Sequence, residues 1–348
     1  MKILYGVQGT GNGHIARARA MSAALKARGL DVDYLFSGRD KNTYFSMEAF
    51  GSYQTRKGLT FSTENGQVSY LKTVKNNNVL ALIDEIKRLD LSKYDLILND
   101  FEPITAWAAK WQNKTCISIS HQNAFRYSVP LKGASWFDKQ LIHHFAPSDY
   151  AIGLHWYHFE QPILPPIVHS IHCPSEQGNF ILVYLPFENS DEICNLLFRF
   201  SSYQFVCFHP GVNKVETIEN VELRPLSHES FQSYLHGCNG VIANGGFELP
   251  SEALTLGKKL LLKPLSGQFE QQSNVATLDS LGLATSMEFL DASKVRVWLD
   301  EKPGEKVNYP DVAQAIAEWV HKGHWDTQDL LCQSLWEKVD FPSYVSNL

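Results

Sequence analysis

The residues best suited to chemistry follow two short apolar runs, one in each half of the chain. The loop Gly9–His14 comes directly after the run Ile3–Val7, and the turn Asn244–Gly246 comes directly after Val241–Ala243. Glycine permits a tight turn that brings backbone close to a ligand, and histidine exchanges a proton near neutral pH. We therefore expect an anion-binding turn in each half and a general base in the first half.

A helix is expected after the second glycine turn, with Pro250 tolerated near its start and Gly257 at its end. Its positive end and free N–H groups would then lie at the carboxyl edge of a strand, which suits a diphosphate. Glu248 and Glu252 are four residues apart and share one face of this helix. A carboxylate at this position can accept two hydrogen bonds from a vicinal diol such as a ribose.

Amide side chains open the helix that follows. It is expected to begin near Gln268, after the strand Leu260–Leu262 and the loop Pro264–Gly267. The amides of Gln271 and Gln272 can both donate and accept hydrogen bonds, as sugar hydroxyls require.

The first half offers several candidates for the base. His14 is the first choice, Asp100 the second and Glu102 the third, because all three are expected at strand ends that share one sheet edge. Asp100 can instead orient His14 or cap the next helix, and His14 can serve only as a hydrogen-bond donor to phosphate. Arg17 and Arg19 lie within two turns of His14, where one of them can aid anion binding unless both are solvated.

No metal site is expected. The Asp31–Asp33 segment has Asp-x-Asp spacing but precedes a strand, so it lies at the wrong edge of the sheet. Asp100 and Glu102 supply only two carboxylates, and His155 and His158 lack clear further ligands. We therefore expect no essential metal and no other cofactor.

Size and charge fit a two-domain chain without membrane spans. The 348 residues contain no apolar run near the roughly 20 residues of a membrane helix. Residues 1–170 hold 19 Lys and Arg against 14 Asp and Glu, and the remainder holds 12 against 23. A positive first half favours an anionic acceptor or a phospholipid surface. No CxxC pair occurs among the cysteines, which we expect to be reduced in the cytoplasm: Cys116, Cys173, Cys194, Cys207, Cys238 and Cys332.

The order of predicted elements indicates two α/β halves. Strand Ile3–Val7, helix Ile15–Arg28 and strand Val32–Ser37 form a βαβ start, which predicts a parallel sheet. The glycine loop lacks the GxGxxG order, so NAD is not expected. A proline-rich segment, Gln161–Ile167, is the expected linker, and the strand Ile181–Leu185 restarts the pattern. Two doubly wound halves would then face a cleft.

These motifs resemble the donor-binding segment of GT-B nucleotide-sugar glycosyltransferases. The resemblance rests on Asn244-Gly245-Gly246, Ser251-Glu252-Ala253-Leu254, Gly257-Lys258 and the glutamine-rich helix start. It is closest to the branch whose enzyme adds N-acetylglucosamine to the lipid-linked peptidoglycan precursor. The residues expected to bind the donor are Gly11, Gly13, Asn189, Arg224, Leu226, Asn244, Gly245, Gly246, Glu248, Glu252, Gln268, Gln271 and Gln272.

The resemblance also implies an architecture. Residues 1–165 would form a Rossmann-like acceptor-side domain and residues 166–325 the donor-binding domain. Residues 326–348 would carry a helix that crosses back to the first domain, with the indoles of Trp319, Trp325 and Trp336 in its packing.

The function implied is transfer of a sugar from a UDP-sugar, of UDP-N-acetylhexosamine type, to an unknown hydroxyl with inversion. The acceptor would be anionic or lipid-linked, as in cell-envelope polysaccharide synthesis, at the inner face of the membrane; no nucleic acid is expected. The string Gly11–Arg17 is also similar to the start of UDP-sugar hydrolases of nonulosonic acid synthesis. A hydrolase and a non-catalytic nucleotide-sugar binding protein therefore remain alternatives, and an epimerase is a weaker one.

Overall fold

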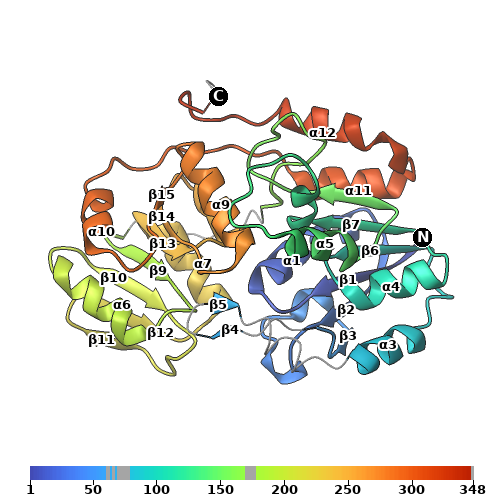
Figure 1. Ribbon diagram of the computed structural model, residues 1–348, viewed down its shortest axis with the longest axis horizontal. Helices are drawn as coiled ribbons and strands as arrows, with labels where there is room; N and C mark the ends of the chain where they lie inside the picture. The colour runs from blue at the N-terminus through green and yellow to red at the C-terminus, as the bar shows by residue number, and fades with distance from the viewer. Residues whose placement is uncertain (60–62, 65–66, 69–78, 169–177, 346–348) are drawn as a thin grey trace.

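The computed structural model describes residues 1–59, 63–64, 67–68, 79–168 and 178–345, and it has two α/β domains side by side (Figure 1). The sheet of the first domain is parallel throughout, with strand order β3-β2-β1-β6-β7-β8. Its strands are β1 (Lys2–Gln8), β2 (Asp31–Ser37), β3 (Tyr53–Arg56), β6 (Leu96–Asp100), β7 (Cys116–Ser120) and β8 (Tyr150–Gly153). Its helices are α1 (Asn12–Ala27), α3 (Val79–Arg88), α4 (Pro103–Trp111) and α5 (Trp136–His144).

The second sheet has the order β11-β12-β10-β9-β13-β14-β15 and is parallel except at β11. Its strands are β9 (Ile181–Tyr184), β10 (Phe205–Phe208), β11 (Glu216–Ile218), β12 (Val221–Arg224), β13 (Gly240–Asn244), β14 (Lys259–Lys263) and β15 (Thr285–Ser286). Its helices are α6 (Ser190–Leu197), α7 (His228–Gly237), α8 (Glu248–Thr255), α9 (Phe269–Ser280) and α10 (Ala292–Leu299).

Short elements complete the described chain. A two-stranded antiparallel ribbon joins β4 (Thr63–Glu64) to β5 (Gln67–Val68). The 3-10 helices are η1 (Lys41–Thr43), η2 (Glu48–Phe50), η3 (Gln122–Arg126), η4 (Phe198–Phe200) and η5 (Trp325–Thr327).

Both sheets reverse their strand order in the same way. Without the edge strand β11, each sheet places its first strand in the middle, with the next two strands on one side and the last three on the other. This is the doubly wound order, in which ligands bind outside the carboxyl ends of the strands where the order reverses. The reversal lies between β1 and β6 in the first domain and between β9 and β13 in the second. The expectation of two Rossmann-like domains is confirmed.

The last two helices, α11 (Val312–Lys322) and α12 (Gln328–Trp336), return to the first domain (Figure 1). Arg28, the C-cap residue of α1, donates to Glu318 of α11 across 2.8 Å. The Trp336 indole donates to the carbonyl of Ile163 at 2.6 Å, and Trp325 lies edge-on to Tyr150. The return therefore begins at α11, earlier than the expected boundary at residue 326, because Val312, Ile316 and Val320 form an apolar face buried in the shared core.

The proline-rich segment is not a free linker. Ile163 and Leu164 are fully buried, and Leu164 forms a β-bridge with Leu154. Gln328 of α12 donates to the carbonyl of Pro162. The segment is fixed because α12 covers it. This contact joins residues that are far apart in the sequence.

One apolar cluster runs through both domains. It includes Val7 of β1, Trp156 after β8, Phe247 before α8 and Ile316 of α11. The Trp156 indole donates to Ser251 of α8 at 2.9 Å, so the second domain is tied to the first by packing and by a buried hydrogen bond.

Cys116, Cys194, Cys207, Cys238 and Cys332 are buried and form no disulfide, and Cys173 lies outside the described residues. None of the helices in the described ranges has the length and apolar character that crossing a membrane requires.

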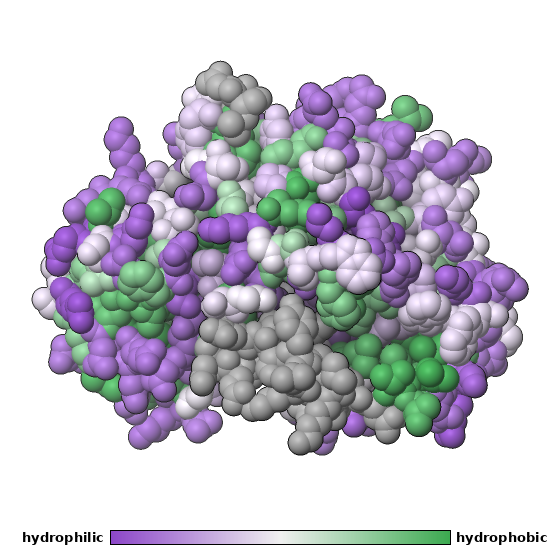
Figure 2. Space-filling view, in the orientation of Figure 1, coloured by the Kyte–Doolittle hydropathy of each residue, from purple (hydrophilic) through white to green (hydrophobic). Residues whose placement is uncertain are grey.

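An apolar patch lies over α3 at the lower right of Figure 2, where Val79 and Leu80 are exposed.

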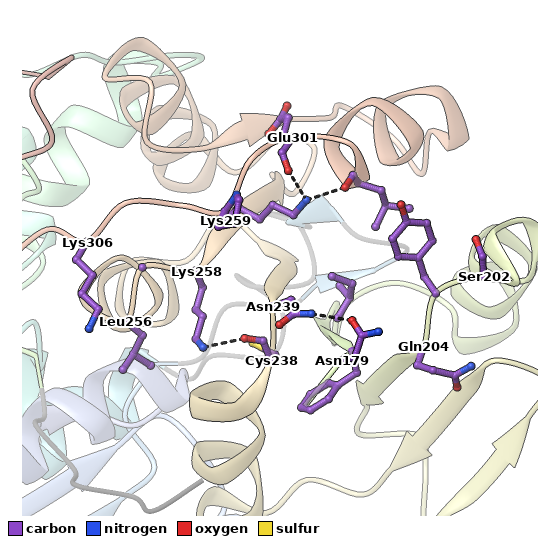
Figure 3. A pocket seen from close by; sticks show the side chains of 16 residues that line it. Asn179, Ser202, Gln204, Cys238, Asn239, Leu256, Lys258, Lys259, Glu301 and Lys306 are labelled. Carbon is purple, nitrogen blue, oxygen red and sulfur yellow. Dashed lines mark hydrogen bonds between the residues drawn. The ribbon is translucent and has the colours of Figure 1, made fainter. Parts of the chain in front are cut away.

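A hollow of about 630 Å³ lies at the amino-terminal edge of the second sheet (Figure 3). Lys258 donates to the carbonyls of His236 and Cys238, both at 2.7 Å, and so caps the end of α7. Lys259 donates to the carbonyls of Trp298 and Leu299 and caps the end of α10. The ammonium groups thus complete helix ends, where cations are favourable.

We predict that Lys258→Met lowers the free energy of unfolding by about 1–3 kcal/mol, because two carbonyls in a partly enclosed position lose a charged donor. Chemical denaturation followed by circular dichroism measures the change. Lys306→Met is the matched control, since Lys306 is an exposed lysine on the rim of the same hollow. Equal denaturation midpoints for the two variants would contradict this assignment.

Candidate active site

The carboxyl edges of the two sheets face each other across a cleft of about 130 Å³. This edge is the one where both sheets reverse their strand order, and it lies opposite the hollow of Figure 3. Both domains line the cleft, with Asn12, Gly13, Ile15, Ala16, Arg19 and Phe45 from the first domain and Tyr184, Leu226, Ser227, His228, Phe231, Gln232, Glu248, Leu249 and Glu252 from the second.

His14 lies in the first turn of α1 and contacts the end of β6. Its Nδ1 is 2.8 Å from Oδ1 of Asp100, and Asp100 is completely buried. An ionised carboxylate only accepts hydrogen bonds, so Nδ1 carries the proton and Nε2 keeps a lone pair. The histidine is thus oriented by the carboxylate, which is one of the two roles expected for Asp100.

Arg17 lies one turn after His14 on the same face of α1 and is also buried. Its Nε donates to Asp100 Oδ2 at 2.8 Å, and its Nη2 donates to Oδ1 at 2.7 Å. This two-pronged contact fixes the carboxylate plane. Burial alone would raise the pKa of Asp100, but Arg17 and His14 outweigh that effect and hold this pKa below its ordinary value.

Glu248 and Glu252 lie on one face of α8, as predicted, but they have different partners. Glu248 accepts a hydrogen bond from Nη1 of Arg17, across the domain boundary. Glu252 accepts a hydrogen bond from Gln232 at 2.9 Å and lines the cleft. Burial raises the pKa of Glu252 to about 7, opposed by the Gln232 hydrogen bond and the charge of Arg19.

The Asn244–Gly246 turn is held by the helix after it. Gln271 Oε1 accepts hydrogen bonds from the N–H of Gly245 at 3.2 Å and of Leu265 at 3.0 Å. The N–H of Gly246 donates back to the carbonyl of Asn244. These two glycine N–H groups therefore have partners within the protein, and Gln271 supports the turn instead of presenting its amide oxygen to a sugar.

A second buried contact fixes this turn against the first domain. Asn274 donates to the carbonyl of Gly245 at 3.0 Å, and its Oδ1 lies 2.7 Å from Nε2 of His121. The ring of His121 stacks on Phe247 with centroids 3.9 Å apart. A cross-domain packing contact thus sets the place where α8 begins.

Three helices that begin at the carboxyl edges of the two sheets have no side-chain cap. The residues preceding α1, α8 and α9 are Gly11, Phe247 and Gln268, and none of them accepts a capping hydrogen bond. Glu102, Asn189 and Asp291 cap other helices, Ser227 caps α7 at the cleft itself, and α12 also begins without a cap. The first N–H groups of a helix have no partner inside it, so the uncapped starts leave donors and positive dipole ends for an anion.

The other predicted donor residues divide into two groups. Gly13 and Leu226 line the cleft, and a Cβ on Gly13 would lie 3.0 Å from Glu248 Cγ. Gln272 of α9 lies against the loop of Gly133, where a Cβ on Gly133 would meet its Oε1 at 2.2 Å. Asn189, in contrast, is exposed and caps α6.

Arg224 and Asn244 lie beside the cleft without lining it. Arg224 pairs with Glu222 and lies over the ring of Tyr234. The Asn244 amide donates to the carbonyl of Lys263 at 3.0 Å.

Glu102 is not placed to act as a base. It is fully buried and accepts hydrogen bonds from Ser37 and from the N–H groups of Ile104 and Thr105, so it caps α4. Burial raises its pKa, and these hydrogen bonds oppose the rise. The oxygens of its carboxylate accept the first N–H groups of α4. The sequence alone did not show that Glu102 caps this helix.

No group of three or more His, Cys, Asp or Glu side chains in the described ranges is arranged to hold a metal ion. Asp33 pairs with Lys93 and Tyr94 near the amino end of β2, so it lies away from the cleft as expected.

Gln232 and Phe45, which line the cleft, were not predicted as site residues, because no local sequence pattern marks them. Arg17 could be found from the sequence, because its spacing of three residues from His14 places both side chains on one face of a helix.

Two parallel-sheet domains that face one cleft at their carboxyl edges define the GT-B fold. The family model for glycosyl transferase family 1 matches residues 1–303, and the chain belongs to this family. A search of curated proteins finds no match.

Solved glycosyltransferases share this fold at low sequence identity. SsfS6 from Streptomyces sp. SF2575, complexed with thymidine diphosphate, has a TM-score of 0.59 and 12% identity, covering 95% of this chain and 98% of that one. UGT89C1 from Arabidopsis thaliana, complexed with UDP, has a TM-score of 0.55 and 15% identity, covering 99% and 97%. SnogD from Streptomyces nogalater has a TM-score of 0.56 and 14% identity, covering 94% and 96%.

Proposed function

We propose that this protein transfers a sugar from a UDP-sugar, of UDP-N-acetylhexosamine type, to an acceptor hydroxyl with inversion and without an essential metal. The observation that carries the proposal is that α1 and α8, two helices with uncapped starts from different domains, line one cleft beside a histidine held by a buried carboxylate. Helix N-termini stabilise a diphosphate as it departs, which is the charge that this reaction must accommodate.

The base in this proposal is His14. Its Nε2 takes the proton of the acceptor hydroxyl while the hydroxyl oxygen attacks the anomeric carbon and the bond to the diphosphate breaks. Asp100 stabilises the imidazolium that forms. A single displacement of this kind inverts the anomeric centre.

Donor contacts follow from the cleft lining. Glu252 is placed to accept hydrogen bonds from a ribose diol, and Gln232 orients its carboxylate. Leu226 and Phe231 give the neighbouring wall an apolar surface on which a nucleobase can pack. The choice of UDP also draws on the UDP complex of the fold relative UGT89C1.

The proposed acceptor is anionic or lipid-linked. Trp136 and Phe137, at the start of α5, are 73% and 56% exposed. They follow the loop containing Gly133, which lies against Gln272 of α9. Lys132 and the positive first half add charge complementarity to an anionic chain or membrane. Action at the inner face of a membrane, with reduced cysteines, is part of this proposal.

Hydrolysis is the second candidate, favoured by the place of Arg17. The Gly11–Arg17 string that resembles UDP-sugar hydrolases brings Arg17 as well as His14 into the site. The same base would then activate water in place of an acceptor hydroxyl.

We expect purified protein to release UDP from a UDP-N-acetylhexosamine only when a lipid-linked or anionic acceptor is present, and to do so in EDTA. UDP formation and sugar transfer are both measured, with the product's anomeric configuration assigned by NMR. Sugar release without acceptor would establish the hydrolase, and UDP binding without turnover would establish a binding protein. Complete loss in EDTA, restored by magnesium or manganese, would overturn the metal-free proposal.

We expect His14→Ala to lower turnover by roughly 10²–10⁴-fold while UDP affinity stays within a few-fold, because the base acts only in the chemical step. Steady-state rates and calorimetry measure the two effects. His321→Ala, an exposed histidine on α11, is the control. A parallel collapse of UDP affinity would make His14 a phosphate ligand, and the Asp100→Asn variant would then test the other base.

We expect Glu252→Ala to weaken UDP binding by about 1.5–3 kcal/mol through loss of a charge-assisted contact. In the native protein UDP should bind about tenfold more weakly at pH 6 than at pH 8, because the ionised carboxylate is the better acceptor and burial raises its pKa to about 7. Glu252→Gln should remove this pH dependence.

Calorimetry at several pH values checks both expectations. Glu301→Gln, at the opposite edge of the second sheet, is the control for general effects of charge. Unchanged UDP affinity in Glu252→Ala would remove Glu252 from the ribose role.

A further inference from the structure

Arg17 is shared by two carboxylates from different domains. It holds both oxygens of Asp100 in the first domain and one oxygen of Glu248 in the second. Asp100 in turn holds Nδ1 of His14. One continuous chain of contacts therefore runs from the donor-binding helix α8 to the proposed base, through a guanidinium that is 2% exposed.

The contact between Arg17 and Glu248 depends on how the domains lie. Gly13 permits it, because any side chain there would meet Glu248. If the domains move apart, Glu248 leaves with α8, while Arg17 and Asp100 stay together on α1 and β6. Burial raises the pKa of Glu248 to about 8, and the charge of Arg17, which donates directly to this carboxyl group, opposes the rise. The partner that Arg17 loses on opening is thus a carboxyl group whose ionised form Arg17 favours.

We propose that Arg17 is a positioning residue that couples the approach of the two domains to the His14–Asp100 pair. The proposal rests on the proposed function, in which His14 takes a proton. When Glu248 contacts Arg17, the positive charge of Arg17 is shared between two carboxylates, so Asp100 stabilises a protonated His14 more strongly than it would without Glu248. When Glu248 is removed, Arg17 cancels more of the negative charge of Asp100. His14 is then a weaker base.

Few other charges face this cluster. Nη2 of Arg17 lies 3.1 Å from His14 Nδ1, so its charge acts directly on the ring. Glu252 and Arg19 lie further along α8 and α1, on the cleft wall. Tyr5 of β1 lies behind Asp100, and its phenol stays neutral because burial raises its pKa.

The test is a titration of His14 in protein labelled at histidine, followed by NMR between pH 5 and pH 9, with the signal assigned by its loss in His14→Ala. Arg17→Gln should raise the midpoint by about one pH unit, because Asp100 is left unopposed. Glu248→Gln should lower it by a similar amount, because Arg17 then acts on Asp100 alone. Opposite shifts are the expected signature, since loss of structure has no reason to produce them.

Arg17→Lys keeps the charge and should leave the midpoint within about half a unit of the native value. If Arg17→Gln fails to fold, Arg17→Lys and Glu248→Gln are the two variants whose His14 midpoints are compared with the native value. Arg28→Gln is the control, because Arg28 is the C-cap residue of the same helix but pairs with Glu318 at the surface. Unchanged midpoints, or shifts of the same sign in Arg17→Gln and Glu248→Gln, would overturn the proposal.

The titration needs no substrate, so it separates this inference from the proposed function. If the native protein transfers sugar, the acid limb of its pH–rate profile should move with each midpoint. If no transfer is found while the midpoints move in opposite directions, the coupling stands and the proposed function fails.

Discussion

Three charged side chains are buried together between the domains, and each depends on the others. Arg17 neutralises Asp100 and reaches Glu248, and removal of one partner from such a cluster costs about 3–5 kcal/mol. That is a large share of the 5–15 kcal/mol by which a typical domain is stable. The position of α1 against α8 therefore follows from electrostatics as much as from apolar packing. His14 takes its orientation from the same cluster, so the proposed base is held by interactions that also join the domains.

This arrangement limits how a donor enters. The cleft measures about 130 Å³, whereas sites for small molecules usually exceed roughly 300 Å³. A ligand larger than this space would require the domains to separate or the side chains between them to shift. The contacts of Trp156 with Ser251, and of His121 with Phe247, lie on α8 and its N-cap within one turn of Glu248, and they add buried aromatic packing to the same interface.

Local patterns predicted the elements well and indicated two α/β halves, and the resemblance to glycosyltransferases then implied the GT-B fold. The glycine turns after β1 and β13, and the helices that follow, lie where apolar runs and turn residues indicated. What failed were the hydrogen-bond assignments: Glu102 caps α4, and Gln271 occupies the N–H of Gly245. Each of these polar groups had several possible partners, and only the three-dimensional packing selected one. The return of α11 was missed for the same reason, since its apolar face fits any hydrophobic neighbour.

The return of α11 and α12 makes the first domain discontinuous in sequence. Its sheet is made from residues 2–153, but its core is closed by helices that begin at Val312. During synthesis the second domain, continuous from β9 to α10, is complete before those helices leave the ribosome. The second domain can therefore fold first, while the first waits for its final helices. Truncation near residue 311 would expose apolar surface of α1 and the proline-rich segment. The domain that it destabilises would be the first one, although the truncated residues lie at the other end of the sequence.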